Sequence, residues 1–337
     1  MRRFWFWFAV LLGPFGVAAQ DPAVPINAIV NGQIIGGFKD LRDASLVLSE
    51  ASEATCDAAD TNLRQSYKDA FLAWAKVGHF RFGPTEELNR GFALAFWPDP
   101  RGKTPKTLRS LIANADEALL APDTFLEQSV AIRGFYALDY LLFDESLAAL
   151  GSDAYRCALT QAITNDIKTN TAELAAAWSA FAPSLLEPKP DGVYRTETEV
   201  IAALFNAVLT GMQFNSEMRL GRPLGTPERP RPKRAEARRS NLSRDLLRAS
   251  LSGTVLLAQA LATADAELAQ KFESLSARTD EDLIERADLA FSDLDDPIAR
   301  LRLEAIKTVV DDIWRTAALE LGPLLGVAAG FNSLDGD

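Results

Sequence analysis

The chain has 337 residues, which is enough for one large hydrophobic core or two smaller ones. Its 46 acidic residues outnumber its 35 basic residues, which gives a formal net charge of −11 at pH 7. This acidic balance argues against nucleic acid or an anionic membrane as the main partner.

The first residues have the pattern of a secretory signal peptide. Two arginines follow Met1, an apolar run covers residues 4–12, and small residues end at Ala19. The apolar run is shorter than the roughly 20 residues that a membrane span needs. No cysteine follows it for a lipid anchor, and no other segment is apolar enough to span a bilayer. The sequence therefore predicts a periplasmic protein from which residues 1–19 are removed.

Cys56 and Cys157 are the only two cysteines. An even number of cysteines in an exported chain favours a disulfide, and two buried thiols are the alternative. The bond would close a long loop, so its stabilisation would be on the order of 4–5 kcal/mol in the entropic description.

Apolar residues at spacings of three and four predict helices along the whole mature chain, and no convincing strand pattern interrupts them. Prolines 183, 188 and 190 mark the best domain boundary. The sequence therefore predicts an all-α protein with long ordered loops and two packed helical bundles, over residues 24–185 and 195–337. The predicted helices cover about 24–56, 61–77, 106–114, 125–143, 153–181, 196–220, 240–260, 265–277, 280–291 and 297–319.

Two segments lack helical periodicity. Residues 78–102 form a long stretch rich in Phe and Trp, which we expect to pack onto the body and to wall a pocket. Residues 221–239 are rich in proline and arginine. They could dock an anion or a partner, or they could be a stiff linker whose charges pair with the acidic surface. Ser240, directly after them, is the expected N-cap of the next helix.

The segment 133–143 places polar groups on an otherwise apolar helix. Arg133, Tyr136 and Asp139 are three residues apart and would share one face. Gly134 would let a backbone or a ligand come close. A polar stripe on a buried helix needs partners, water or a bound ligand.

This segment resembles the signature of the imelysin family of periplasmic and outer-membrane proteins. The family pattern is Gly-x-His-x-x-Glu followed by Leu-Leu-Phe or Leu-Leu-Trp, in which the His and the Glu are the proposed metal ligands. Here Tyr136 stands at the His position and Asp139 at the Glu position. The resemblance implies a helical fold, a site between two bundles and a role in bacterial iron acquisition. Residues 81–84, 96–99, 229–240 and 330–337 also resemble family segments.

The residues argue against a zinc peptidase. The chain has one histidine, His79, and neither His-Glu-x-x-His nor His-x-x-Glu occurs. No serine or cysteine nucleophile has a recognisable setting either. Tyr136 and Asp139 are hard oxygen ligands that suit ferric iron or another hard cation such as calcium, with further carboxylates from Asp99, Asp335 or Asp337. The alternative is a buried Arg133–Asp139 ion pair, and Arg133 would also permit an anionic ligand.

We therefore expect an exported, imelysin-like protein that binds a small ligand or metal ion and has no peptidase activity. Two alternatives stay open: a degenerate metallopeptidase, and an interaction module that docks a membrane-protein partner through residues 221–239. The expected ligand site between the bundles comprises Tyr136, Asp139, Arg133, His79, Arg81 and Asp99, with Tyr136 and Asp139 as the metal ligands.

Overall fold

The computed structural model describes residues 24–327. The predicted signal peptide and the C-terminal acids Asp335 and Asp337 lie outside the described residues. Within 24–327 every regular element is a helix, and the only extended pairing is an isolated bridge between Thr226 and Arg229. The predicted all-α class is therefore confirmed.

The elements follow one another in chain order as α- and 3-10 helices with three π-helical segments, η1, η6 and η8, among the described residues. They are α1 (Ile26–Ala28), η1 (Ile29–Ile35), α2 (Gly36–Ala54), α3 (Thr61–Val77), η2 (Gly83–Thr85), η3 (Glu87–Asn89), α4 (Arg90–Leu94), α5 (Lys103–Asn114), η4 (Glu117–Leu120), α6 (Pro122–Leu126), η5 (Val130–Ile132), α7 (Gly134–Phe143), α8 (Glu145–Ala148), α9 (Asp153–Leu186), α10 (Glu197–Gln213), η6 (Phe214–Gly221), α11 (Arg222–Leu224), η7 (Pro232–Arg234), α12 (Ser243–Leu261), α13 (Ala266–Arg286), α14 (Pro297–Thr316), η8 (Ala317–Leu321) and α15 (Gly322–Leu325).

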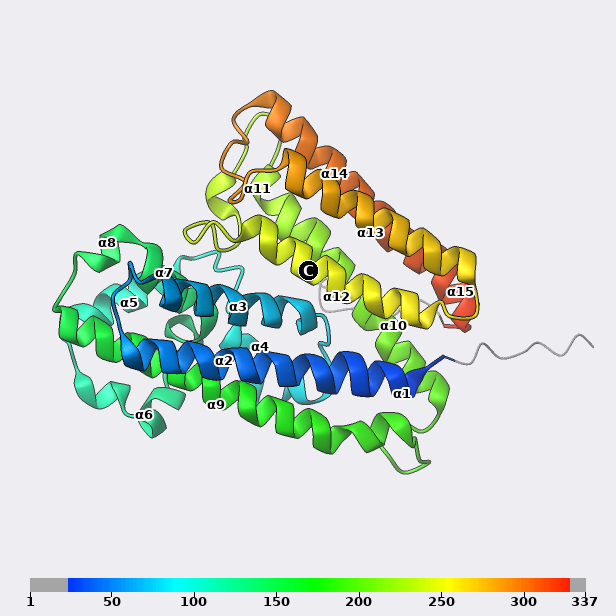
Figure 1. Cartoon of the computed structure of the whole chain (residues 1–337), viewed down its shortest axis with the longest axis horizontal. Helices are drawn as coiled ribbons and strands as arrows, with labels where there is room; N and C mark the ends of the chain where they lie inside the picture. The colour runs from blue at the N-terminus through cyan, green and yellow to red at the C-terminus, as the bar shows by residue number, and fades with distance from the viewer. Residues whose placement is uncertain (1–23, 328–337) are drawn as a thin grey trace, which may run out of the picture.

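The helices form two packed bundles (Figure 1). In the first, α2 lies between α3 and α9, and the shorter helices α5 to α8 gather at one end. In the second, α10, α12, α13 and α14 pack side by side. Phe38 of α2 stacks on Trp178 of α9 with ring centroids 5.3 Å apart, and both side chains are fully buried. Burial of such large aromatic side chains is the main force that holds helices together.

The two bundles meet where α3 crosses α12. A Cβ atom on Gly253 of α12 would lie 2.0 Å from the backbone oxygen of Lys76 at the end of α3. Only a residue without a side chain permits this approach of the two backbones. The loops that follow α3 and precede α12 also meet, since Trp97 of the first and Ala235 of the second line one cavity.

The predicted helix over 125–143 is wrong in its first half. Residues 125–133 contain the end of α6 and the short η5, and Arg133 is extended at φ −111° and ψ 164°. Gly134 then begins α7 with φ +69°, which an L side chain rarely adopts. Arg133 therefore precedes the helix and does not share the face of Tyr136 and Asp139.

Other helix boundaries differ less. Helical structure is continuous from Ile26 to Ala54, and the glycines in its first half fall in or beside the π-helical η1. The two predicted helices over 265–291 are one helix, α13, because no breaking residue separates them. Helix α9 passes Pro183 and ends at Leu186.

Replacing Gly134 by Ala should destabilise the protein by about 2–4 kcal/mol. A Cβ atom there would lie 2.2 Å from the Leu94 backbone oxygen and 2.3 Å from that of Ala93, in addition to the strain of the positive φ. Urea unfolding measures the loss. Gly32 is the matched control, because its Cβ would meet nothing within 4 Å. Equal effects of Gly134→Ala and Gly32→Ala would contradict the packing described.

The predicted disulfide is confirmed: Cys56 and Cys157 are bonded. The bond joins the segment after α2 to the first turns of α9. Among the described helices, none combines the length and the apolar character that a membrane crossing requires.

Candidate functional site

A buried ion pair of the second bundle, Arg219–Glu236, is joined to α7 of the first bundle by a hydrogen bond. The hydroxyl of Tyr136 on α7 donates to Oε1 of Glu236 at 2.5 Å. Glu236 lies in the loop before α12 and accepts from Nε of Arg219 at 2.6 Å and from Nη2 at 3.2 Å. The side chains of Arg219 and Glu236 are only 8% and 2% exposed. A two-bond contact of this kind is among the stronger polar interactions in proteins.

Further hydrogen bonds hold the two charged side chains in place. Arg219 lies in the π-helical η6, and its Nη1 donates to Asn215 at 2.8 Å and to Ser250 of α12 at 2.9 Å. Ser243, the first residue of α12, donates to the backbone oxygen of Glu236 at 2.5 Å. π-Helical turns often occur at functional sites, and here the turn places Arg219 opposite Glu236.

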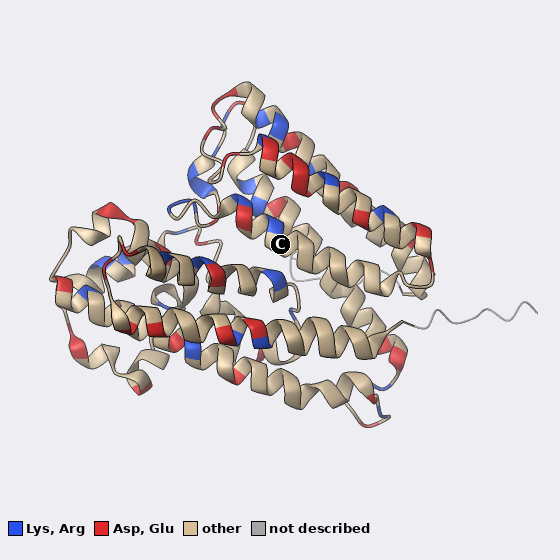
Figure 2. Ribbon diagram, in the orientation of Figure 1, with Lys and Arg blue, Asp and Glu red and all other residues tan. Residues whose placement is uncertain are grey.

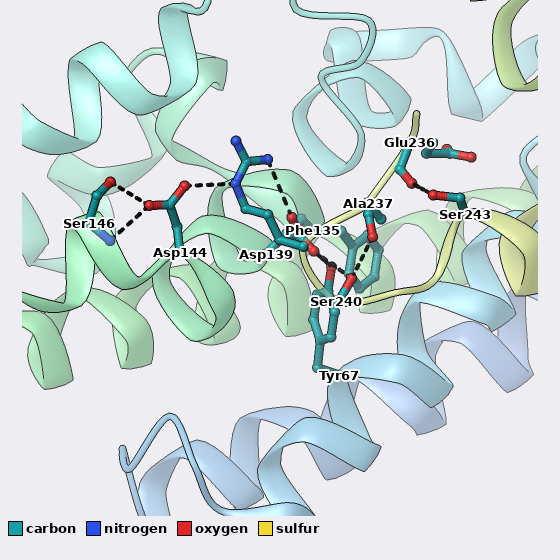
Figure 3. A network of polar contacts seen from close by, with 10 residues as sticks. Tyr67, Phe135, Asp139, Asp144, Ser146, Glu236, Ala237, Ser240 and Ser243 are labelled. Atoms are coloured by element: carbon teal, nitrogen blue, oxygen red, sulfur yellow. Dashed lines mark hydrogen bonds and ion pairs between the residues drawn. The ribbon is translucent and has the colours of Figure 1, made fainter. Parts of the chain in front are cut away.

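A second polar group on α7 is held in the same way. Asp139 is 2% exposed and accepts from Ser240 at 2.5 Å and from Tyr67 of α3 at 3.3 Å. Figure 3 shows Asp139 directed toward Ser240 and Tyr67. Ser240 was expected to cap a helix, but α12 begins at Ser243 and the Ser240 hydroxyl binds Asp139. Burial raises the pKa of Asp139, while the bond from Ser240 and the charge of Arg239 oppose the rise.

Arg239 extends the network toward the surface. Its Nε donates to Asp144 at 2.8 Å, and its guanidinium carbon lies 3.5 Å from the centre of the Tyr140 ring. The distance from Nη1 to Asp139 is 3.9 Å. Ser146 donates to the same Asp144, as Figure 3 shows. The end of α7 is thereby tied to the loop of the second bundle.

Trp97 lines three neighbouring cavities beside this network. The inner cavity, of about 20 Å³, is lined by His79, Tyr136, Arg219 and Glu236. The basic cavity, of about 130 Å³, is lined among others by Asp99, Tyr136, Asp139, Arg222, Lys233 and Arg234. The loop cavity, of about 230 Å³, lies between Trp74, Arg81, Thr85 and Phe92. The predicted pocket-walling role of residues 78–102 agrees with these linings.

A larger and more open groove of about 630 Å³ runs between α3, α12 and α13. Four of its charged groups form ion pairs: Lys68 lies 2.7 Å from Asp245, and Arg248 lies 2.6 Å from Asp280. Because these charges are already paired, the smaller cavities around Trp97 are the better candidate for a ligand site.

His79 is the most unusual group in the inner cavity. It is 3% exposed, and neither ring nitrogen has a partner within hydrogen-bond limits. Its ring packs on Phe80 with centroids 4.1 Å apart. Burial lowers the pKa of His79 to about 3, and the Lys76 backbone opposes this only in part. The imidazole is therefore neutral at neutral pH.

The buried His79 should make stability fall as the pH falls from 6.5 toward 3. The unfolded chain binds a proton near pH 6.5, whereas the folded chain does so only near pH 3. The loss is roughly 2–3 kcal/mol between pH 6.5 and 4.5. Urea unfolding of the wild type and His79→Gln at both pH values gives the difference. Equal pH slopes would contradict a buried neutral imidazole, and since it is the only histidine, its NMR titration is unambiguous.

The structure brings five of the six predicted ligand residues to these cavities. Tyr136 and Asp139 line the basic cavity together with Asp99, while His79 and Arg81 line the inner cavity. Asp99 also caps α5 by accepting from the backbone nitrogens of Lys103 and Thr104 at 2.9 and 2.8 Å.

Arg133 is the exception, because it lines none of these cavities. It binds Asp166 of α9 through Nε at 3.0 Å and Nη2 at 2.7 Å, and its Nη1 donates to the backbone oxygen of Leu126. The ion pair of Arg133 with Asp139 considered from the sequence is therefore wrong. The extended backbone at Arg133 turns its side chain toward α9.

The residues around Tyr136 do not fit a bare metal ion. Burial raises the pKa of Tyr136 well above 10 and Glu236 raises it further, so the phenol stays protonated and acts as a donor. Arg219 neutralises Glu236, and Asp139 is occupied by Ser240. Across residues 24–327, no group of three or more His, Cys, Asp or Glu side chains could hold a metal ion.

Sequence reasoning missed Glu236, Arg219, Ser240 and Tyr67 as members of the site. One signal was available: Glu236 is the only acidic residue in the basic stretch 229–239. An isolated carboxylate among arginines is a candidate for a structural ion pair.

Comparison with known proteins gives one family. The model of the imelysin family matches residues 34–314. The search of curated proteins gave no significant match.

Two solved structures share the fold. An imelysin-like protein from Psychrobacter arcticum 273-4 is 21% identical, with a TM-score of 0.76 over 91% of this chain and 96% of its own. A candidate iron-regulated protein A precursor from Parabacteroides distasonis ATCC 8503 is 12% identical, with a TM-score of 0.73 over 89% of this chain and 93% of its own. At these identities the likeness concerns the fold alone.

Proposed function

Because this chain belongs to the imelysin family, we propose that it is an exported protein that binds a small ligand between its two helical bundles, serves iron acquisition and hydrolyses no peptides. The observation that carries the proposal is the buried contact of Tyr136 with Glu236 and Arg219, which borders cavities that also expose an unpartnered His79.

The free-energy cost of burying the Arg219–Glu236 pair supports a binding role. Burial of charged groups is stabilising only when their geometry is nearly complete, and replacement by apolar residues is often as stable. A protein that needed only a bundle interface could use leucines there. Aromatic walls with a few convergent polar groups are the usual composition of a small-molecule site, and Trp97, Trp74 and Tyr136 supply them here.

The absence of hydrolysis is supported by the chemistry of the donors. A zinc peptidase needs ligands with free lone pairs, an open coordination position and a base. Tyr136 stands at the position of the family's histidine, and its hydroxyl donates a hydrogen bond to Glu236. His79 has free nitrogens, but it lies in a different segment and belongs to no cluster of three candidate ligands within 24–327.

Export and the link to iron rest on separate observations. The signal-peptide pattern and the Cys56–Cys157 disulfide both favour an oxidising compartment. The Parabacteroides protein carries the name of an iron-regulated protein. Its overall fold matches this chain over most of both lengths.

Retention of iron by the purified mature chain tests the proposal. Radioactive iron supplied as ferric citrate should co-elute with the wild type in gel filtration, and insulin and casein should stay intact with or without zinc. Tyr136→Phe removes the hydroxyl that donates a hydrogen bond to Glu236, so iron retention should weaken about tenfold. Tyr194→Phe is the matched control, since the Tyr194 ring packs on Phe181 and lines none of the three cavities.

A second variant guards against a folding defect in Tyr136→Phe. Trp97→Leu changes the wall of all three cavities without touching the ion pair and should also weaken retention. Circular dichroism and melting verify the fold of each variant. Zinc-dependent cleavage of insulin would establish the peptidase alternative, and failure of the wild type to retain iron would overturn the proposal.

A further inference from the structure

Both acidic residues that line the basic cavity have hydrogen-bond partners, whereas three of its basic residues have none among the described residues. Its two acids are occupied: Asp139 accepts from Ser240 and Tyr67, and Asp99 accepts from the backbone nitrogens that begin α5. Three of its basic residues, Arg222, Lys233 and Arg234, have no side-chain hydrogen bond or ion pair with any residue of the described range. The fourth, Arg239, is paired with Asp144.

Arg222 forms the wall of the cavity and the other two form its mouth. The Arg222 guanidinium lies over the Trp97 ring at 5.8 Å, and its buried Nε has no partner. Lys233 and Arg234 are exposed on the adjoining η7. Burial lowers the pKa of Arg222 and the nearby charge of Arg234 lowers it further, so the two guanidinium groups lie close enough to repel each other.

This concentration of positive charge is unlike the rest of the molecule. The chain carries a net charge of −11. Figure 2 shows Lys and Arg gathered around α11 and the loop before α12, whereas Asp and Glu are spread over the outer helices. Like charges held together without counter-ions cost free energy, and a bound anion would remove that cost.

We propose that Arg222, Lys233 and Arg234 form an oxyanion subsite, and that the ligand of this protein enters the basic cavity through carboxylate or phosphate groups. Arginine binds such groups through paired N–H donors, and lysine adds a point charge. The extension to iron rests on the proposed function: the metal is carried as an anionic chelate, because the same charges repel a bare cation.

The position of the three residues favours a small anion over a large surface. They converge on a cavity of about 130 Å³ that is closed on one side by Trp97 and Tyr136. The net charge of −11 would repel an extended polyanion such as an anionic membrane or a nucleic acid. A compact anion with two or three oxygen-bearing groups avoids this repulsion.

Calorimetric titration of the full mature chain at low ionic strength tests the subsite. The probes are metal-free citrate, inorganic phosphate, ferric citrate, calcium chloride and vesicles of phosphatidylglycerol. At least one anion should bind, and raising the salt from 20 to about 200 mM should weaken binding. Arg222→Gln and the double variant K233Q/R234Q should each lower the affinity by roughly tenfold or more. Lys189→Gln is the matched control, because Lys189 is equally exposed but lies beyond α9.

The outcomes separate this inference from the proposed function. Binding of metal-free citrate or phosphate that depends on the three residues, without binding of ferric citrate, supports the subsite and removes the iron role. Binding of ferric citrate that the variants do not change supports the iron role and overturns the subsite. Calcium or vesicle binding without any anion binding overturns the subsite as well. Arg222→Gln and K233Q/R234Q test it independently, so a fold defect in one leaves the other decisive.

Discussion

Replacing Glu236 by Gln should lower the free energy of unfolding by about 3–5 kcal/mol, because it leaves the charge of Arg219 buried without its counter-charge. The Arg219 side chain is 8% exposed, so water cannot replace the lost carboxylate without local opening. The Tyr136 hydroxyl loses its charged acceptor in the same variant. Urea unfolding at pH 7 measures the change, and circular dichroism verifies that the variant is folded.

Two control variants test whether the loss comes from a buried, unpaired charge. Glu320 pairs with Lys271 on the surface, with both side chains almost half exposed, so Glu320→Gln should cost less than about 1 kcal/mol. The double variant R219M/E236L removes both charges and should be more stable than Glu236→Gln alone. If Glu236→Gln costs no more than Glu320→Gln, the ion pair is not desolvated as described.

The architecture followed from sequence periodicity, because long amphipathic helices bury one face and repeat it every three or four residues. The predicted helix boundaries were wrong where a single residue sets the backbone conformation. At Arg133 and Gly134 the chain turns through an extended residue and a positive φ so that Gly134 can meet the carbonyls of Ala93 and Leu94. That contact joins segments about 40 residues apart, and the sequence around Gly134 contains no pattern that predicts it.

In the two hydrogen bonds that join α7 to the loop before α12, only the α7 residue of each could be predicted from the sequence. Tyr136 and Asp139 were identified because polar groups stand out on an apolar helix. Their partners Glu236 and Ser240 lie about 100 residues later in a loop with no periodicity, so only the fold brings them together. The basic stretch 229–239 was recognised by its charge. Its division into Arg239, which pairs with Asp144, and Arg234, which has no side-chain partner within residues 24–327, depends on which side chains reach α7.

Removal of the disulfide should lower the free energy of unfolding by about 4–5 kcal/mol in the double variant C56A/C157A. The bond closes a loop of 101 residues, which is most of the first bundle. Opening such a loop mainly enlarges the unfolded ensemble, so the folded site should keep its structure. Urea unfolding of the oxidised wild type and of the double variant gives the difference.

The urea m-value identifies where the disulfide acts. If the bond restricts the unfolded chain, C56A/C157A exposes more surface on unfolding and its m-value rises. If the bond instead holds α2 against α9 in the folded state, the m-value stays constant and the near-ultraviolet signal of Trp178 changes. A loss below about 1 kcal/mol would contradict both accounts, since neither allows a long cross-link to be neutral. The Cys56→Ala single variant, compared with the double variant, separates the effect of the bond from that of a leftover thiol at Cys157.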